Sequence, residues 1–226
     1  MEISYWQSRW RKQHIGFHME QGYEGLKTHF HKLNLPAKST VLVPLCGKSV
    51  DMIWLDEQNM NVIGVEVSEE AVLQFIDEHN HTCSKKNFAQ FTIYSSGNFQ
   101  LWCGDFFRLP AHKISGIDLI YDKAALVALP PKMRVRYADK ILGLCSPDTN
   151  ILLHHFEYSQ NEMKGPPFSV SKKEIHNLFD HFFTIKTLEQ NDLDISKYPK
   201  FQKRGLKTTF TERFLLLTPK QPFNKD

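Results

Sequence analysis

Short apolar runs alternate along the chain with segments in which apolar residues recur every three or four positions. The runs have the length of buried strands, and the other segments have the spacing of helices with one buried face. Strands are expected at residues 40–45, 61–67, 91–95, 99–103, 117–121, 150–156, 182–188 and 210–217, and helices within 1–35, at 49–58, from 68 onward, at 130–144 and at 171–180. This alternation predicts a doubly wound, mostly parallel α/β sheet. The last two strands, close in sequence, predict an antiparallel hairpin at its edge.

A ligand is expected at the carboxyl ends of the strands, where doubly wound sheets bind their ligands. The first of these ends reads LCGKS at residues 45–49, and its Gly-Lys-Ser is similar to the end of a phosphate loop. A phosphate loop has another glycine five positions before Gly47, where this chain has Leu42. A dinucleotide fingerprint needs three glycines, and only Gly47 is present. Neither a nucleoside triphosphate nor a dinucleotide is therefore expected.

Glu66 ends the second predicted strand, about twenty residues beyond the first turn, where an acid can accept both hydroxyls of a ribose. The alternative role, a favourable charge at a helix N-terminus, falls to Glu69 and Glu70, which follow the expected N-cap Ser68. Glu66 is therefore favoured as a ribose ligand. Cofactors that contain adenosine without a pyrophosphate are favoured in turn, with S-adenosylmethionine first among them.

Composition and charge exclude several other classes of protein. The 226 residues are 41% hydrophobic, as in a folded protein, and a net charge of +3 is too small to indicate nucleic-acid binding. No apolar run approaches the roughly 18 residues that a membrane span requires. The four cysteines form no C-x-x-C pair, which favours a reducing cytoplasm, and the histidines lack zinc-site spacing. Cys46 is expected to be a packed thiol, because the sequence places no base beside it.

Trp6 and Trp10 stand four residues apart on one face of the predicted N-terminal helix. Two roles fit this spacing equally well. The pair can anchor the helix on the sheet, or it can cover a cationic cofactor, because tryptophan faces attract cations.

Seven segments spread over nearly the whole chain carry the most specific signal. They are WQSRW at 6–10, IGFH at 15–18, VLVPLCGKSVDM at 41–52, VIGVEVSE at 62–69, Gly97-Asn98, YDKAALVALP at 121–130 and GPPF at 165–168. In this order, the segments resemble the thiopurine S-methyltransferase family, and its bacterial branch most of all. The Pro-Leu-Cys-Gly-Lys turn makes the resemblance specific, because it is unusual among methyltransferases.

The resemblance implies a class I methyltransferase fold with a mostly parallel seven-stranded sheet, an antiparallel edge hairpin and N-terminal helices that cover the site. It implies a single domain over residues 1–226, with the helical cover at 1–35, and a monomer in the cytoplasm. The implied cofactor is S-adenosyl-L-methionine. Its expected ligands are Trp10 packed on it, Leu45 at its methionine part, Glu66 at the ribose, Asp105 and Phe106 beside the adenine, and Lys123. Phe17 is expected to face the acceptor.

Lys123 stands where the family usually has arginine. It keeps the positive charge but lacks the planar fork with which arginine binds a carboxylate. It is expected to engage the carboxylate of the cofactor or an anionic acceptor.

The predicted activity is the methylation of aromatic and heterocyclic thiols such as thiopurines, by in-line transfer from S-adenosylmethionine. Such thiols ionise readily, so no residue is assigned a proton-transfer role, and no metal is expected. One alternative keeps the cofactor and changes the acceptor to selenium or tellurium compounds, as in metalloid detoxification. Another is a cofactor-binding module without catalysis. In each catalytic case the partner is a small molecule, and neither nucleic acid nor a membrane is expected.

Overall fold

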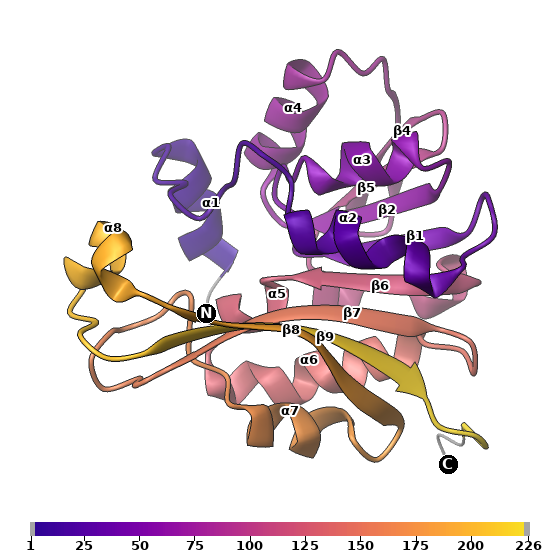
Figure 1. Ribbon diagram of the computed structural model, residues 1–226. Helices are drawn as coiled ribbons and strands as arrows, with labels where there is room; N and C mark the ends of the chain where they lie inside the picture. Colours follow the sequence, from indigo (N-terminus) through magenta and orange to yellow (C-terminus); the bar gives the residue numbers. More distant parts are fainter. Residues whose placement is uncertain (1–2, 224–226) are drawn as a thin grey trace. The chain divides into compact units, whose positions relative to one another are not determined.

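The computed structural model describes residues 3–223, and the chain divides into two compact units, residues 1–121 and 122–226 (Figure 1). Residues 1, 2 and 224–226, the two ends of the predicted domain, lie outside the described residues. The single domain predicted over residues 1–226 stays a prediction.

The first unit contains a mixed sheet in the order β3-β4-β5-β2-β1-β6. Its strands are β1 (Thr40–Pro44), β2 (Asn61–Glu66), β3 (Ser84–Phe88), β4 (Phe91–Ser96), β5 (Phe99–Cys103) and β6 (Ile117–Lys123), whose last two residues begin the second unit. Strands β5, β2, β1 and β6 are parallel, and β3, β4 and β5 form an antiparallel meander. The parallel register places Glu66 opposite Cys103, so β2 and β5 end at the same level.

Four α-helices belong to the first unit: α1 (Ile3–Arg11), α2 (Glu24–Phe30), α3 (Asp51–Glu57) and α4 (Glu69–Glu78). Three short 3-10 helices accompany them, η1 (His31–Leu33), η2 (Phe106–Arg108) and η3 (Ala111–Lys113). Helices α3 and α4 lie against β2, and α1 lies beside α4 (Figure 1). The core of this unit is built from the apolar residues of β1 and β2 and from the buried stripe of α4, with Val72 and Phe75 fully buried.

The second unit contains the antiparallel strands β7 (Asn150–Tyr158), β9 (Phe210–Pro219) and β8 (Phe183–Leu193), in the order β7-β9-β8. Its helices are α5 (Ala125–Ala128), α6 (Pro131–Leu144), α7 (Lys172–Phe179), the 3-10 helix η4 (Ile195–Lys197) and α8 (Pro199–Gln202). Proline is tolerated in the first turn of α6, and the Ser171 hydroxyl caps α7 by accepting a hydrogen bond from the Glu174 N–H (3.1 Å).

Every strand and principal helix predicted from the sequence is present, within a few residues of the predicted ends. Nine strands occur in the described chain, against the seven that the family resemblance implies. Eight of them, β4 included, match strands predicted from the apolar pattern, and β3 is the additional one. Ser68 occupies the N-cap of α4 as predicted, but its side chain makes no capping hydrogen bond. Within residues 3–223, no helix is long and apolar enough to cross a bilayer.

Candidate functional site

The turn after β1 has an unusual backbone. Leu45 has φ of 49° and Gly47 has φ of 55°, so two residues in three adopt the left-handed conformation. Glycine adopts this conformation freely, but a leucine pays a steric cost for it. The Cys46 N–H donates to the Val65 carbonyl (3.0 Å), and the Gly47 N–H donates to the Glu66 carboxylate Oε2 (2.9 Å). The end of β2 therefore holds the turn in place.

The Glu66 carboxylate joins the two turns at the ends of β1 and β2. Its Oε2 accepts from Gly47, its Oε1 accepts from the Ser68 N–H (2.8 Å), and the residue is only 6% exposed. Burial raises the pKa of Glu66 above its ordinary value of 4.5, and the hydrogen bonds from the backbone partly oppose that shift. A carboxylate has about four acceptor sites, of which the backbone uses two. Capacity remains for the two hydroxyls of a ribose, so this residue fits the expected cofactor.

Trp10 of α1 covers the same turn. The residue is 2% exposed, and a Cβ atom added to Gly47 would lie 3.0 Å from its Cζ2 atom. Phe17 packs edge-on against both tryptophans, with ring centroids 5.4 Å from Trp6 and 5.5 Å from Trp10, and remains 44% exposed. Trp10 thus anchors α1 at the first turn, one of the two roles that the spacing left open. Its contact with a cationic cofactor stays a prediction.

The turn after β5 lies next to Glu66, because the Gly104 N–H donates to the Glu66 backbone carbonyl (2.8 Å). Asp105 caps the short helix η2 by accepting from the Phe107 N–H (3.0 Å). Phe106 is buried, with 1% exposure. The first unit therefore brings Leu45, Glu66 and this turn together, whereas the contact of Asp105 and Phe106 with an adenine stays a prediction.

Lys123 belongs to the second unit, at the end of β6, and its neighbour Asp122 is committed to the fold. The Asp122 Oδ1 accepts from the Ala125 and Leu126 N–H groups (2.8 and 3.1 Å), and its Oδ2 accepts from the Tyr137 hydroxyl (2.9 Å). Burial raises the pKa of Asp122 to about 6. Asp122 thus shapes the turn that carries Lys123.

Lys123 is half-buried and lies close to the partnered His154 and Glu212 side chains (2.6 Å between Nε2 and Oε1). Burial lowers the pKa of His154 to about 4, and the Lys123 charge adds to that shift. His154 is therefore neutral at pH 7, and its Nε2–H donates a hydrogen bond to the ionised Glu212 carboxylate. A role for Lys123 at the cofactor stays a prediction.

Two other chemistries receive no support from the described chain. Cys46 is buried, and both burial and the nearby Glu66 charge raise its thiol pKa well above the ordinary value. This is the packed thiol expected from the sequence. Among residues 3–223, no group of three or more histidine, cysteine or acidic side chains is arranged to hold a metal ion.

Asp51 is a buried acid beside the first turn that the sequence analysis did not single out. It is 3% exposed, and its carboxylate accepts from the Tyr23 N–H (2.6 Å) and from the Tyr121 hydroxyl (3.0 Å). It thereby ties the start of α3 to β6 and to the segment before α2. An acid in the first helical turn after a strand-end glycine was the available signal, but it is common at any helix N-terminus.

Comparison with solved structures identifies the fold. One is the 1,6-didemethyltoxoflavin-N1-methyltransferase of Burkholderia thailandensis, with bound 1,6-didemethyltoxoflavin and S-adenosylhomocysteine. It has a TM-score of 0.62 and 16% identity, over 96% of this chain and 87% of that one. Another is a SAM-dependent methyltransferase from Methanosarcina mazei, with a TM-score of 0.60 and 15% identity, over 84% of this chain and 96% of that one. The chain thus has the class I methyltransferase fold predicted from its sequence.

Sequence comparison then identifies the family. The model of the thiopurine S-methyltransferase family matches residues 1–220. A thiopurine S-methyltransferase of Nitrosospira multiformis is 40% identical over 96% of this chain and 99% of its own length. One of Legionella pneumophila is 46% identical over 82% of this chain and 84% of its own. The chain belongs to the thiopurine S-methyltransferase family. The prediction of an S-adenosylmethionine-dependent methyltransferase is therefore confirmed.

Proposed function

We propose that this chain transfers the methyl group of S-adenosylmethionine to the sulfur of aromatic and heterocyclic thiols, thiopurines among them. The observation that carries the proposal is the arrangement in the first unit. A buried carboxylate, Glu66, is fixed beside a one-glycine turn, and an aromatic cluster of Trp6, Trp10 and Phe17 covers that turn. The relatives that share the family are named thiopurine S-methyltransferases.

The strand-end turns supply the binding groups. Glu66 accepts the ribose hydroxyls, and its bonds to Gly47 and Ser68 hold the carboxylate in one orientation before the cofactor arrives. Such pre-organisation lowers the entropy cost of binding. Leu45 lies in the same turn and faces the methionine part, while Asp105 and Phe106 lie beside the adenine.

The aromatic cluster supplies the environment for transfer. When bound, the cofactor supplies a methyl group on a positively charged sulfur. The Phe17 ring stands nearly perpendicular to that of Trp10 and is partly exposed. It offers an apolar surface to the flat ring of an acceptor thiol. Such a surface displaces water from both sulfur atoms and lets the chain hold them in line. Lys123 attracts an acceptor that arrives as a thiolate. The thiol ionises in solution, so no side chain needs to remove its proton.

A methyl-transfer assay with labelled S-adenosylmethionine tests this proposal. The panel contains a thiopurine, a thiophenol, selenite and tellurite, and mass spectrometry identifies each product. The expected result is S-methylation of the two aromatic thiols. If only selenite or tellurite gives a labelled product, the acceptor is a metalloid compound rather than a thiol. If the cofactor binds and no product forms, the protein is a non-catalytic cofactor-binding module.

We also infer that the protein acts as a monomer in the cytoplasm and removes reactive thiols. The four cysteines are all free thiols, which is typical of proteins from a reducing compartment. Light scattering of the purified protein is expected to give the mass of one 26.4 kDa chain, and a dimer mass would contradict the inference.

A further inference from the structure

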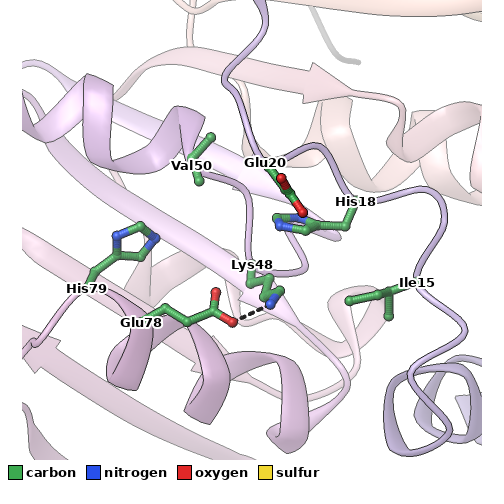
Figure 2. A pocket seen from close by; sticks show the side chains of 7 residues that line it. All are labelled: Ile15, His18, Glu20, Lys48, Val50, Glu78 and His79. Carbon is green, nitrogen blue, oxygen red and sulfur yellow. Dashed lines mark hydrogen bonds and ion pairs between the residues drawn. The ribbon is translucent and has the colours of Figure 1, made fainter.

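A cavity of about 340 Å³ lies in the first unit, apart from the residues assigned to the cofactor and the acceptor (Figure 2). It is bounded by the segment at residues 15–20, the turn after β1 and the C-terminal end of α4. The side chains that line it are Ile15, His18, Glu20, Lys48, Val50, Glu78 and His79. The expected chemistry of the family site uses none of them.

Lys48 is the central charge of this cavity. It is only 8% exposed, and its Nζ atom pairs with the Glu78 carboxylate Oε1, as Figure 2 shows. The Glu78 side chain is 46% exposed. A buried ammonium is costly unless an opposite charge accompanies it. The pair therefore fixes where the Lys48 side chain runs, and with it the backbone of the turn.

Two residues of the cavity are chain neighbours of two residues of the proposed site. Lys48 follows Gly47, which donates to Glu66 and contacts Trp10. His18 follows Phe17, which packs on the same tryptophan. The segments 17–18 and 47–48 thus each contribute one residue to the cavity and one residue to the proposed site. A side chain that moves in the cavity displaces the backbone of a site residue directly.

We propose that Lys48 and Glu78 are positioning residues for the methyl transfer, because their ion pair sets the Gly47 turn and holds the 15–20 segment so that Phe17 stays on Trp10. This inference rests on the proposed function. Neither residue touches the cofactor or the acceptor. They act through the turn at Gly47 and through the lining that Lys48 shares with His18.

The surroundings of His18 disfavour its protonated, charged form. Burial, and then the Lys48 charge, lower the pKa of His18 below its ordinary value of 6.5, while Glu78 and Glu20 oppose the shift and His79 adds slightly to it. His18 is therefore neutral at pH 7. Replacing Lys48 by methionine removes a lowering cause, and replacing Glu78 by glutamine removes a raising one. The two variants are expected to shift the His18 titration, followed by NMR, in opposite directions.

The deciding experiment is calorimetric binding of S-adenosylhomocysteine, without acceptor, to the wild type and to Lys48→Met, Glu78→Gln and Lys48→Arg. Both charge-removing variants are expected to bind about tenfold more weakly, since small displacements in a site carry costs of this size or larger. Lys48→Arg is expected to bind within about threefold of the wild type, because the adjacent cavity has room for the guanidinium. Glu70→Gln is the matched control, because Glu70 is an exposed acid on the same helix that accepts a hydrogen bond from the Gln74 side chain.

Kinetics separate positioning from general damage. Positioning raises the cofactor KM about tenfold and leaves kcat at saturation within about threefold, whereas partial unfolding lowers kcat and leaves KM unchanged. If Lys48→Met does not fold, Glu78→Gln decides, because glutamine keeps the size of the half-exposed Glu78 side chain and its amide oxygen can still accept a hydrogen bond from Lys48. Wild-type affinity in Glu78→Gln overturns the inference and leaves the proposed function standing. Failure of the wild type to bind overturns the proposed function itself.

Discussion

The replacement of Glu66 by glutamine probes the cofactor site with the least change of shape. The side chain keeps its length but loses its charge, and one carboxylate oxygen becomes an NH₂ donor. In the wild type both oxygens accept backbone N–H bonds, from Gly47 and from Ser68. The amide oxygen of glutamine can accept from one of these N–H groups, but its NH₂ group is a donor and cannot accept from the other. Both the fold and the proposed ribose contact are therefore affected.

The size of the effect follows from the bonds that are lost. A hydrogen bond to a charged group contributes about 1.5–3 kcal/mol, and a neutral amide oxygen recovers part of it. We expect cofactor binding to weaken by about 1–3 kcal/mol, which corresponds to roughly 5- to 150-fold in Kd. A buried N–H without an acceptor costs a further 1–3 kcal/mol or so of folding free energy. The two effects are separate and need separate measurements.

Calorimetric titration of S-adenosylhomocysteine measures the first effect, and thermal unfolding without ligand measures the second. The titration is run well below the Tm of the variant, so that only folded protein is present. Glu70→Gln serves as the control, because this acid is exposed in the first turn of α4. A folded Glu66→Gln protein with the Kd of the wild type would refute the assignment of Glu66 to the ribose.

Three further predictions follow from the same contacts. Burial raises the pKa of Glu66, so its charge is lost on acidification earlier than that of an exposed glutamate. Cofactor affinity is expected to fall with a midpoint above pH 4.5, and a calorimetric midpoint at or below 4.5 would contradict this. Gly47→Ala places a Cβ 3.0 Å from Trp10 at φ of 55°, and is expected to weaken cofactor binding and to lower the Tm. Gly97→Ala, with φ of 56° and nothing within 4 Å, carries the same backbone strain and should lower only the Tm. Burial raises the pKa of Asp122 from 3.8 to about 6, so the folded state holds an extra proton between these values. As pH rises through this range, the wild type should lose about 3 kcal/mol of unfolding free energy relative to Asp122→Asn in denaturant titrations, and parallel pH profiles would be the opposing result.

The strand ends could be predicted because buried strands are apolar, so that a polar residue marks where each strand ends. The run at 61–66 is apolar except for its first and last residues, and its acid therefore marks where β2 stops. Glu66 was found in this way, and the structure places it against the Gly47 turn. The resemblance to a family extended the prediction to Trp10 and Phe17, which pack together although no periodicity relates them.

The polar strand β3 could not be predicted from its residues. Its sequence, SKKNF, has an almost entirely exposed pattern, so no alternation of apolar and polar residues marks it. It forms because its backbone pairs with β4, a contact made only once the sheet exists. The left-handed conformation of Leu45 could not be predicted either, because leucine rarely adopts it and only the surrounding fold imposes it.

The Lys48–Glu78 pair was missed for a related reason. The two residues are 30 positions apart in sequence and lie on different elements, and no sequence pattern relates them. Charged residues on separate helices and turns are mostly solvated. The burial of Lys48 follows from its position in the cavity between the 15–20 segment and α4, which only the folded chain forms.

A crystal structure of the protein with S-adenosylhomocysteine tests the central claim most directly. The account predicts electron density for the ribose beside the Gly47 turn, with both hydroxyls within hydrogen-bond distance of the Glu66 carboxylate. A ribose bound elsewhere, with Glu66 still joined only to Gly47 and Ser68, would contradict it.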